Sequence, residues 1–306
     1  MISIRARIVR WITGRYIQRL DVHSADVLKL RRRLDLFGSL LMKAFRVKLE
    51  RTTINGLYAE WLRPKKARRG KVLLYLHGGA YVMGSCRSHR QMVSHIARAA
   101  GIDALVPEYR LSPEHKFPDA IDDAVGVYRE LLATGFKPED IVISGDSAGG
   151  GLTVATLLTL RDSGDPMPAA AVLLSPFLDV TASGDSATSR AEKDPWFHAS
   201  DMKVVVDHYC DESLVRDPRV SPVFANVDGL PPVYIQVGDH EILLSDSTRF
   251  ADNLREKGGV VKIEIWPEMW HVFQLFIGKM PEARRAINKI GEYVRARMTA
   301  QEKSEA

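Results

Sequence analysis

Short apolar runs and longer amphipathic stretches alternate along the middle of the chain. The apolar runs stand at residues 72–76, 104–107, 141–144 and 170–174. The segments between them have the length and spacing of helices. Strands that alternate with helices pair in parallel, because each helix carries the chain back across the sheet. The sequence therefore predicts an α/β fold with a mostly parallel sheet and helices on both faces.

The pattern continues on both sides of this series. Asn55-Gly56, the dipeptide most typical of a tight hairpin, separates two strand-like runs and predicts an antiparallel pair at the start of the sheet. Between about residues 175 and 230 the alternation lapses, which indicates an insertion, and it then resumes up to a closing helix. Eight strands are predicted, at residues 47–54, 57–62, 72–76, 104–107, 141–144, 170–174, 233–237 and 260–266.

The composition is that of a globular protein. Of the 306 residues, 45% are hydrophobic and 26% are charged, which excludes intrinsic disorder as the main state. No apolar run approaches the roughly 20 residues of a membrane-spanning helix. Cys86 and Cys210 form no disulfide framework or metal-ligand pattern. Five arginines interrupt the first 20 residues, which consequently lack the apolar core of a secretory signal. We expect a cytoplasmic protein.

Positive charge is concentrated at the N-terminus. Residues 1–48 hold 12 Lys/Arg and 3 Asp/Glu, whereas the rest of the chain is slightly acidic. Apolar residues in this segment recur at helical spacing: Ile8, Ile12, Tyr16, Ile17 and Leu20. We expect an amphipathic helix that packs on the body and turns an arginine-rich face to solvent, with docking to a membrane surface as the alternative. No nucleic-acid-binding motif is present, so nucleic acid is not an expected partner.

A strand-to-helix turn carries the first candidate catalytic residue. Residues 145–149 read Gly-Asp-Ser-Ala-Gly, a Gly-x-Ser-x-Gly motif between a β-branched run and an apolar helical run. In a nucleophile elbow the serine lies on a strained turn, and glycines flank it because side chains there would collide with the neighbouring strand and helix. A phosphate-binding turn is the alternative, but neither phosphate-binding glycine pattern is present here. We predict Ser147 as the nucleophile.

A serine hydroxyl needs a base, and the base needs an acid to orient it. Among the nine histidines, His271 follows the last predicted strand and therefore lies at the same sheet edge as Ser147. The loop after the preceding strand offers Asp239, Glu241 and Asp246. We choose Asp239 because it directly follows the strand, and Glu241 and Asp246 remain alternatives. The order Ser, Asp, His along the chain is that of an α/β-hydrolase.

A glycine-containing loop follows the first strand of the parallel series. It reads His-Gly-Gly-Ala at residues 77–80, and its glycines allow backbone N–H groups to approach a substrate carbonyl. We predict that backbone N–H groups of this loop, together with that of Ala148, form an oxyanion hole; a simple glycine turn is the alternative. Arg110 and Glu114 are expected to hold this loop through an ion pair or a hydrogen-bonded turn.

Taken together, these motifs resemble the bacterial hormone-sensitive-lipase-like esterases of the α/β-hydrolase superfamily, the GDSAGG group. The motifs are HGGA at 77–80, YRLSPE at 109–114 with Phe117-Pro118, GDSAGG at 145–150, Asp239 and His271. The sequence departs from the family pattern at two places. Ala80 stands where the family has a third glycine, and the Asp-Pro-Leu of the acid motif is replaced by Asp239-His240-Glu241.

The resemblance implies an α/β-hydrolase fold with a helical cap. Residues 1–45 and 180–225 would form the cap, and residues 46–179 and 226–306 the catalytic domain. The apolar cap residues expected to line an acyl pocket include Trp11, Trp196, Phe197, Met202 and Val205.

The implied activity is hydrolysis of short- to medium-chain carboxylic esters through an acyl-enzyme on Ser147. The resemblance also implies that the N–H groups of Gly79, Ala80 and Ala148 are the oxyanion donors. Thioesters and amides are the alternative substrates, and a non-catalytic ligand-binding homologue is the alternative class of protein. No metal or organic cofactor is expected. The expected partner is a small-molecule ester, and the edge strand at 260–266 could pair two copies into a homodimer.

Overall fold

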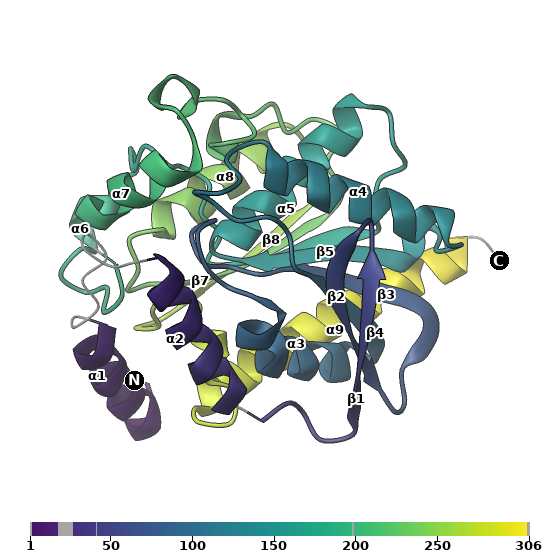
Figure 1. Cartoon of the computed structure of the whole chain (residues 1–306), viewed down its shortest axis with the longest axis horizontal. Coiled ribbons are helices and arrows are strands. Elements are labelled where there is room, and N and C mark those ends of the chain that lie inside the picture. The colour runs from purple at the N-terminus through teal and green to yellow at the C-terminus, as the bar shows by residue number, and fades with distance from the viewer. Residues whose placement is uncertain (1, 18–26, 41, 198, 305–306) are drawn as a thin grey trace.

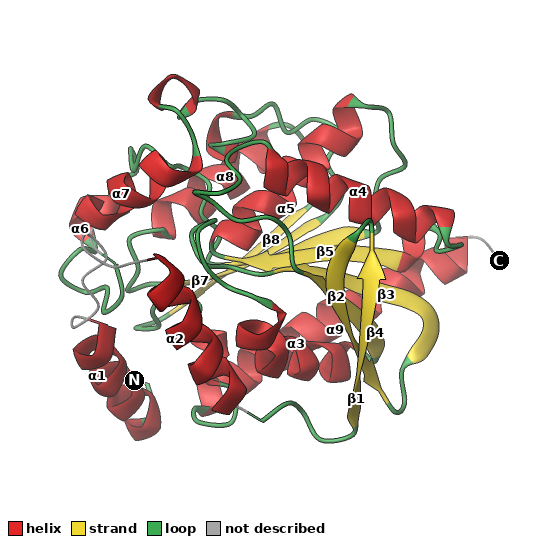
Figure 2. Ribbon diagram, viewed as in Figure 1, coloured by secondary structure: helices red, strands yellow, loops and turns green. Residues whose placement is uncertain are grey.

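The computed structural model describes residues 2–17, 27–40, 42–197 and 199–304. Within them the chain forms an eight-stranded sheet in the order β1-β2-β4-β3-β5-β6-β7-β8 (Figure 2). β2 runs antiparallel to β1 and β4, and the other neighbours are parallel. The strands are β1 (Val47–Ile54), β2 (Leu57–Pro64), β3 (Arg68–Leu76), β4 (Ile102–Pro107), β5 (Ile141–Asp146), β6 (Ala170–Leu174), β7 (Val233–Gly238) and β8 (Val261–Trp266). The predicted mostly parallel eight-stranded sheet is confirmed.

The predicted hairpin is present at the start of the sheet. Ile54 pairs with Leu57 across a two-residue loop. Asn55 (φ 48°) and Gly56 (φ 73°) both adopt the left-handed conformation, which a hairpin loop of this length requires.

Helices cover both faces of the sheet. In Figure 1, α3 (Cys86–Ala100) and α9 (Pro281–Ser304) lie on one face, whereas α4 (Asp119–Ala133), α5 (Ala148–Asp162) and α8 (Leu244–Glu256) lie on the other. Side chains alternate between the two layers, as the pleat of a strand requires. Along β3, for example, Leu74 and Leu76 join the cluster beneath α4 and α5, while Leu73 and Tyr75 join the cluster beneath α3 and α9. Because both faces are covered, the central strands are apolar throughout.

Four further helices are seen toward the left of Figure 1. They are α1 (Ile4–Ile17), α2 (Val27–Leu40), α6 (Ser186–Ser189) and α7 (Ala199–Tyr209). We propose that they form the cap predicted for residues 1–45 and 180–225. The 3-10 turns η1 (Pro138–Asp140), η2 (Glu212–Leu214), η3 (Pro222–Phe224) and η4 (Phe273–Phe276) complete the described structure. No helix among the described residues combines the length and apolar character needed to cross a membrane.

The predicted orientation of the N-terminal helix is wrong. Ile8 and Ile12 were expected to pack on the body, but they are 53% and 54% exposed, whereas Ala6 and Thr13 are buried. The helix is held by polar contacts that the apolar pattern did not show. Ser3 donates its backbone N–H and its hydroxyl to the Glu282 carboxylate at 2.8 and 2.9 Å. Leu20 of the predicted stripe lies outside the described residues.

One helix contact depends on a glycine and gives a testable prediction. A Cβ on Gly291 of α9 would lie 2.5 Å from the carbonyl carbon of Ala99 in α3. A glycine-to-alanine change inside a helix normally gains about 1 kcal/mol, but overpacking costs about 1–3 kcal/mol. We expect Gly291→Ala to lower the free energy of unfolding, measured by urea titration. Gly14→Ala is the matched control, because its Cβ would meet Pro195 at an ordinary 3.4 Å. Equal stability of the two variants would show that α3 and α9 do not need this close approach.

Candidate active site

The turn between β5 and α5 has the predicted strained geometry. Ser147 has φ 52° and ψ −124°, a conformation that non-glycine residues avoid. Its N–H donates to the carbonyl of Leu174 at 2.9 Å, and its own carbonyl accepts hydrogen bonds from the N–H groups of Gly150, Gly151 and Phe177. The surroundings therefore fix the turn on both sides, and Ser147 remains 9% exposed.

The flanking glycines are required by contact between backbones. A Cβ on Gly149 would lie 2.1 Å from the carbonyl oxygen of Leu76 and 2.5 Å from that of His77. A Cβ on Gly145 would lie 2.2 Å from the carbonyl oxygen of Gly149. The first turn of α5 thus rests directly on the end of β3, as expected for a nucleophile elbow.

His271 is paired with a buried glutamate. Its Nδ1 lies 3.0 Å from Oε2 of Glu241, and both side chains are almost fully buried. The second carboxylate oxygen, Oε1, accepts hydrogen bonds from the Ser175 hydroxyl and from the N–H of Gly238. The segment that supplies Ser175 also supplies Phe177, whose N–H binds the Ser147 carbonyl. The elbow and the acid are therefore joined through one short stretch of chain.

The prediction that Asp239 faces His271 is corrected by this geometry. Asp239 still donates its N–H to Trp266 and so prolongs the pairing of β7 with β8. Its side chain is 36% exposed and lies 3.4 Å from the Arg190 guanidinium. The turn that brings a carboxylate to His271 comes two residues later, at Glu241. One signal could have found it: the family motif has leucine two residues after the acid, and Leu243 follows Glu241 at that distance.

The loop after β3 presents free backbone donors. Gly79, Ala80 and Tyr81 have φ values of 127°, 57° and 61°, so Ala80 accepts the left-handed conformation despite its side chain. A Cβ on Gly79 would lie 2.1 Å from the carbonyl oxygen of Met83. The N–H groups of Gly79 and Ala80 donate to no other group of the described residues. Such N–H groups beside the elbow are what an oxyanion hole requires.

Comparison with known proteins shows to which family the chain belongs. Residues 73–275 match a family described as having the alpha/beta hydrolase fold. The chain belongs to this family. An acetyl-hydrolase of Streptomyces hygroscopicus is 42% identical over 243 residues, which cover 79% of this chain and 81% of the relative. An esterase of Acinetobacter venetianus is 36% identical over 265 residues, which cover 86% and 87%.

Solved structures narrow the assignment within the family. An esterase of the bacterial hormone-sensitive lipase family superposes with a TM-score of 0.93 at 39% identity, covering 97% of this chain and 99% of its own. EstE5, in a crystal soaked with p-nitrophenyl butyrate, gives a TM-score of 0.90 at 39% identity with the same coverage. The resemblance to the bacterial hormone-sensitive-lipase group, inferred from the motifs, is confirmed.

In this hydrolase a buried carboxylate joins the oxyanion loop to the elbow. Asp146 accepts hydrogen bonds from the Tyr75 hydroxyl at 2.8 Å and the Gly78 N–H at 3.0 Å, and it lies 3.2 Å from Nε2 of His89. Burial alone would raise the pKa of Asp146, but the charge of His89 and these hydrogen bonds hold it below its ordinary value. Burial opposes the charge on His89 as well, yet Asp146 raises the pKa of that imidazole. The two groups form a buried ion pair.

His77, the first residue of the oxyanion loop, has a structural role. Burial lowers the pKa of His77 to about 3, so the ring is neutral at physiological pH. It stacks on Tyr109 with ring centroids 4.3 Å apart, and the Tyr109 hydroxyl donates to the His77 carbonyl at 2.5 Å. These contacts fix the end of β3, where the oxyanion loop begins.

Arg110 and Glu114 are structural, but they do not pair with each other. Arg110 binds Asp123 of α4 at 2.8 Å. Glu114 binds Arg31 of α2 at 2.7 Å. The same Arg31 guanidinium donates to the carbonyl of Val82, just beyond the oxyanion loop. The predicted support of this loop therefore comes from α2, which the sequence motifs did not indicate.

Aromatic side chains of the insertion cover the imidazole. Phe197 and Trp196 contact the His271 ring, with centroids 4.9 and 6.1 Å away. Asp194 fixes this pair, because one oxygen accepts from the N–H groups of Trp196 and Phe197 and the other from the N–H of Ile242. Burial raises the pKa of Asp194 to about 6, although His271 and the N–H donors lower it. Sequence reasoning did not single out Asp194.

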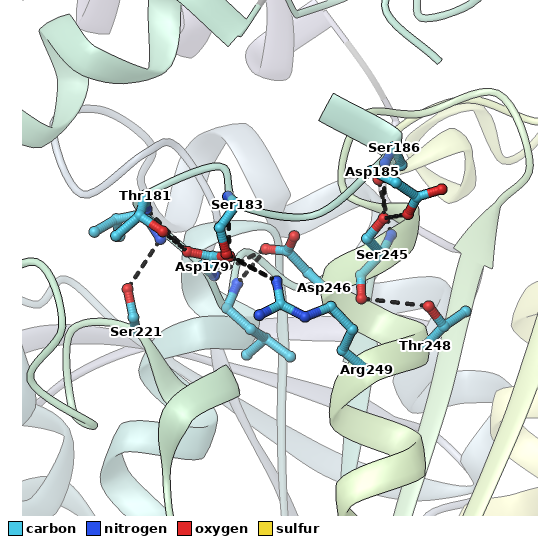
Figure 3. A network of polar contacts seen from close by, with 12 residues as sticks. Asp179, Thr181, Ser183, Asp185, Ser186, Ser221, Ser245, Asp246, Thr248 and Arg249 are labelled. Carbon is cyan, nitrogen blue, oxygen red and sulfur yellow. Dashed lines mark hydrogen bonds and ion pairs between the residues drawn. The ribbon is translucent and has the colours of Figure 1, made fainter. Parts of the chain in front are cut away.

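Asp246, the remaining alternative acid, belongs to a separate network (Figure 3). Its Oδ2 accepts hydrogen bonds from the N–H groups of Leu178 and Asp179 at 2.8 and 2.9 Å. Arg249 of α8 binds the Asp179 side chain at 2.7 Å. Burial raises the pKa of Asp246 well above its ordinary value. This network attaches the segment after β6 to α8. Asp246 is therefore occupied elsewhere, and Glu241 is the carboxylate that binds His271.

The ion pair of Asp146 and His89 predicts a pH-dependent stability. The raised pKa of His89 stabilises the fold fully below about pH 6.5, and this contribution is lost as the pH rises through the folded-state pKa. The lowered pKa of Asp146 contributes above about pH 3.9 and is lost as the pH falls. We expect Asp146→Asn to reduce the free energy of unfolding by about 3–5 kcal/mol at pH 5.5 and by less at pH 8.5.

Urea titrations of the wild type and the variant at both pH values would measure this difference. Asp165→Asn is the control, because Asp165 pairs with the half-exposed Arg129, and such a surface pair contributes only about 0–1 kcal/mol. A loss for Asp146→Asn that is the same at both pH values would contradict the ion pair.

Proposed function

We propose that this hydrolase cleaves short- to medium-chain carboxylic esters through an acyl-enzyme on Ser147. The observation that carries the proposal is the pairing of His271 with Glu241, joined through residues 175–177 to the elbow that bears Ser147. This pairing supports Ser147 as the nucleophile, His271 as the base and Glu241 as the acid, the three roles that acyl transfer by a serine requires. The relatives named esterase and acetyl-hydrolase support ester hydrolysis as the reaction.

The reaction proceeds in two stages on these residues. His271 takes the proton of the Ser147 hydroxyl as the serine oxygen attacks the ester carbonyl, and the N–H groups of Gly79, Ala80 and Ala148 stabilise the resulting oxyanion. The carbon–oxygen bond to the alcohol then breaks, and His271 returns the proton to the departing alcohol. Water, deprotonated by His271, attacks the acyl-enzyme in the second stage and releases the carboxylic acid and free Ser147.

Glu241 is suited to orient and stabilise the protonated His271. Its carboxylate is wholly buried, where a negative charge stabilises an imidazolium more strongly than it would in water. Oε2 faces His271, while Oε1 is held by Ser175 and Gly238. Because Oε1 is fixed from two directions, the carboxylate cannot rotate away from the imidazole.

The surroundings of His271 favour a substrate of limited size. Trp196 and Phe197 pack against the imidazole, so the acyl group meets aromatic walls close to the reacting atoms. The p-nitrophenyl butyrate soaked into crystals of EstE5 is a short-chain ester. Trp11, also expected to line the acyl pocket, is 61% exposed and is removed from that set. Thioesters and amides remain alternative substrates, since the same triad serves every acyl transfer.

We infer a cytoplasmic location from the cysteines. Cys86 and Cys210 are both buried and free, as is usual in a reducing compartment. We also propose that β8, at the edge of the sheet, pairs two copies of the chain. An unpaired edge strand offers backbone groups for this contact.

The proposed reaction is tested by hydrolysis of p-nitrophenyl esters from acetate to palmitate. We expect the specificity constant to peak at a short or medium acyl chain and to fall for palmitate, because Trp196 and Phe197 lie against the His271 ring. Ser147→Ala and His271→Ala should each lower kcat by about 10⁴-fold or more. Activity that survives in Ser147→Ala would overturn the acyl-enzyme, and activity only on thioesters or amides would move the proposal to that substrate class.

The identity of the acid is tested by paired amide variants. Glu241→Gln keeps the size of the side chain but removes the charge that orients His271, and we expect kcat to fall by about 10³–10⁴-fold. Asp239→Asn is the matched control and should change kcat by less than about tenfold, because its carboxylate faces Arg190. The opposite ranking of the two variants would restore Asp239 as the acid.

A further inference from the structure

Exposed apolar side chains are concentrated at the N-terminus of this protein. Of the eleven large apolar side chains that are exposed among the described residues, eight belong to residues 4–45. Four lie on α1 alone: Ile4, Ile8, Trp11 and Ile12, which are 75%, 53%, 61% and 54% exposed. Scattered exposed apolar residues are ordinary, but a contiguous group marks a surface that another molecule covers.

The four side chains form one face of α1. At 100° per residue, Ile4, Ile8, Trp11 and Ile12 fall within a sector of about 100°. Arg15 lies within that sector and stacks over the Trp11 ring at 4.8 Å. The helix has no acidic residue. This outer face of α1, large and apolar with cationic residues around it, has the composition of a helix that lies in a lipid interface.

The outer face cannot turn inward, because the inner face is fixed to the body. Ser3 at the start of the helix is bound to Glu282. On the next turns, Ala6 is fully buried, and the Arg10 guanidinium lies 2.8 Å from Nδ1 of His240 and donates to the carbonyl of Lys193. The inner residues Ala6, Thr13 and Gly14 are small, so the helix lies close to the body with its large side chains outward.

We propose that the outer face of α1 docks the protein on an anionic lipid surface. In this position the isoleucines and Trp11 enter the boundary between headgroups and acyl chains, while Arg5, Arg7 and Arg15 contact lipid phosphates. A second copy of the chain is a poorer occupant, since two such faces would bring their arginines together without counter-charges. A nucleic acid is also poorer, because the three isoleucines offer it no contact.

The test is co-sedimentation of the full-length protein with vesicles of phosphatidylglycerol and phosphatidylcholine in equal amounts, and with pure phosphatidylcholine. We expect the wild type to bind the anionic vesicles at least tenfold more strongly, with binding that weakens as salt is raised. Ile8→Gln/Ile12→Gln should lower this binding at least tenfold without altering net charge. Arg5→Gln/Arg7→Gln should reduce the preference for anionic lipid and the salt dependence.

Two controls make the result specific to α1. Val260→Gln/Ile265→Gln removes two exposed apolar side chains, one just before β8 and one on it, which are 55% and 47% exposed. This variant should bind vesicles as the wild type does. The melting temperature of each variant, and its hydrolysis of soluble p-nitrophenyl acetate, should match the wild type, because the changed residues are exposed. Tryptophan emission of the wild type should change when vesicles are added, and this change should be smaller in Trp11→Phe. Such a difference would report entry of Trp11 into lipid.

Three outcomes would overturn the proposal. The first is that the wild type fails to bind anionic vesicles at low salt. The second is that Ile8→Gln/Ile12→Gln binds as well as the wild type. The third is that the wild type elutes as a dimer, and that Ile8→Gln/Ile12→Gln elutes as a monomer with unchanged vesicle binding. This result would assign the outer face to a second copy of the chain.

Discussion

The active site depends on a contact between backbones at the start of α5. Gly149 rests against the carbonyl groups of Leu76 and His77 with no side chain between them. A contact of this kind leaves little freedom, because protein interiors are close-packed and backbone atoms cannot repack as side chains do. The contact fixes Ser147, which directly precedes α5, relative to the oxyanion loop, which follows β3. Hydrogen bonds to and from Leu174, Gly150, Gly151 and Phe177 hold the strained turn in place.

Several buried carboxylates surround this turn, and their partners distinguish their roles. Asp146 binds the base of the oxyanion loop, Asp246 binds the segment after β6, and Asp194 binds the aromatic cover of the imidazole. Only Glu241 reaches His271 among the described residues. Burial and a perturbed pKa therefore do not by themselves identify a triad acid; the hydrogen bond to the base does.

The fold could be predicted from the sequence because the spacing of apolar residues is a local property. The alternation of short apolar runs with amphipathic helical stretches predicted the parallel sheet, and Asn55-Gly56 predicted the hairpin. The acid could not be chosen this way, because Asp239 extends the pairing with β8 and the chain turns back only at Glu241. The prediction of how α1 is oriented failed for a related reason. The periodicity of Ile8 and Ile12 shows that they share a face, but which face meets the body depends on contacts with Glu282 and His240, more than 200 residues away.

These distant contacts connect α1 to the triad. Arg10 on its inner face binds His240, the residue before Glu241, and the carbonyl of Lys193, the residue before Asp194. Asp194 in turn binds the N–H of Ile242, directly after Glu241. The two loops that bear the triad acid and the aromatic cover of His271 are thus joined by the Arg10 guanidinium as well as by Asp194. The helix that presents the exposed apolar face therefore also contacts, through Arg10, the residues that precede Glu241 and Asp194.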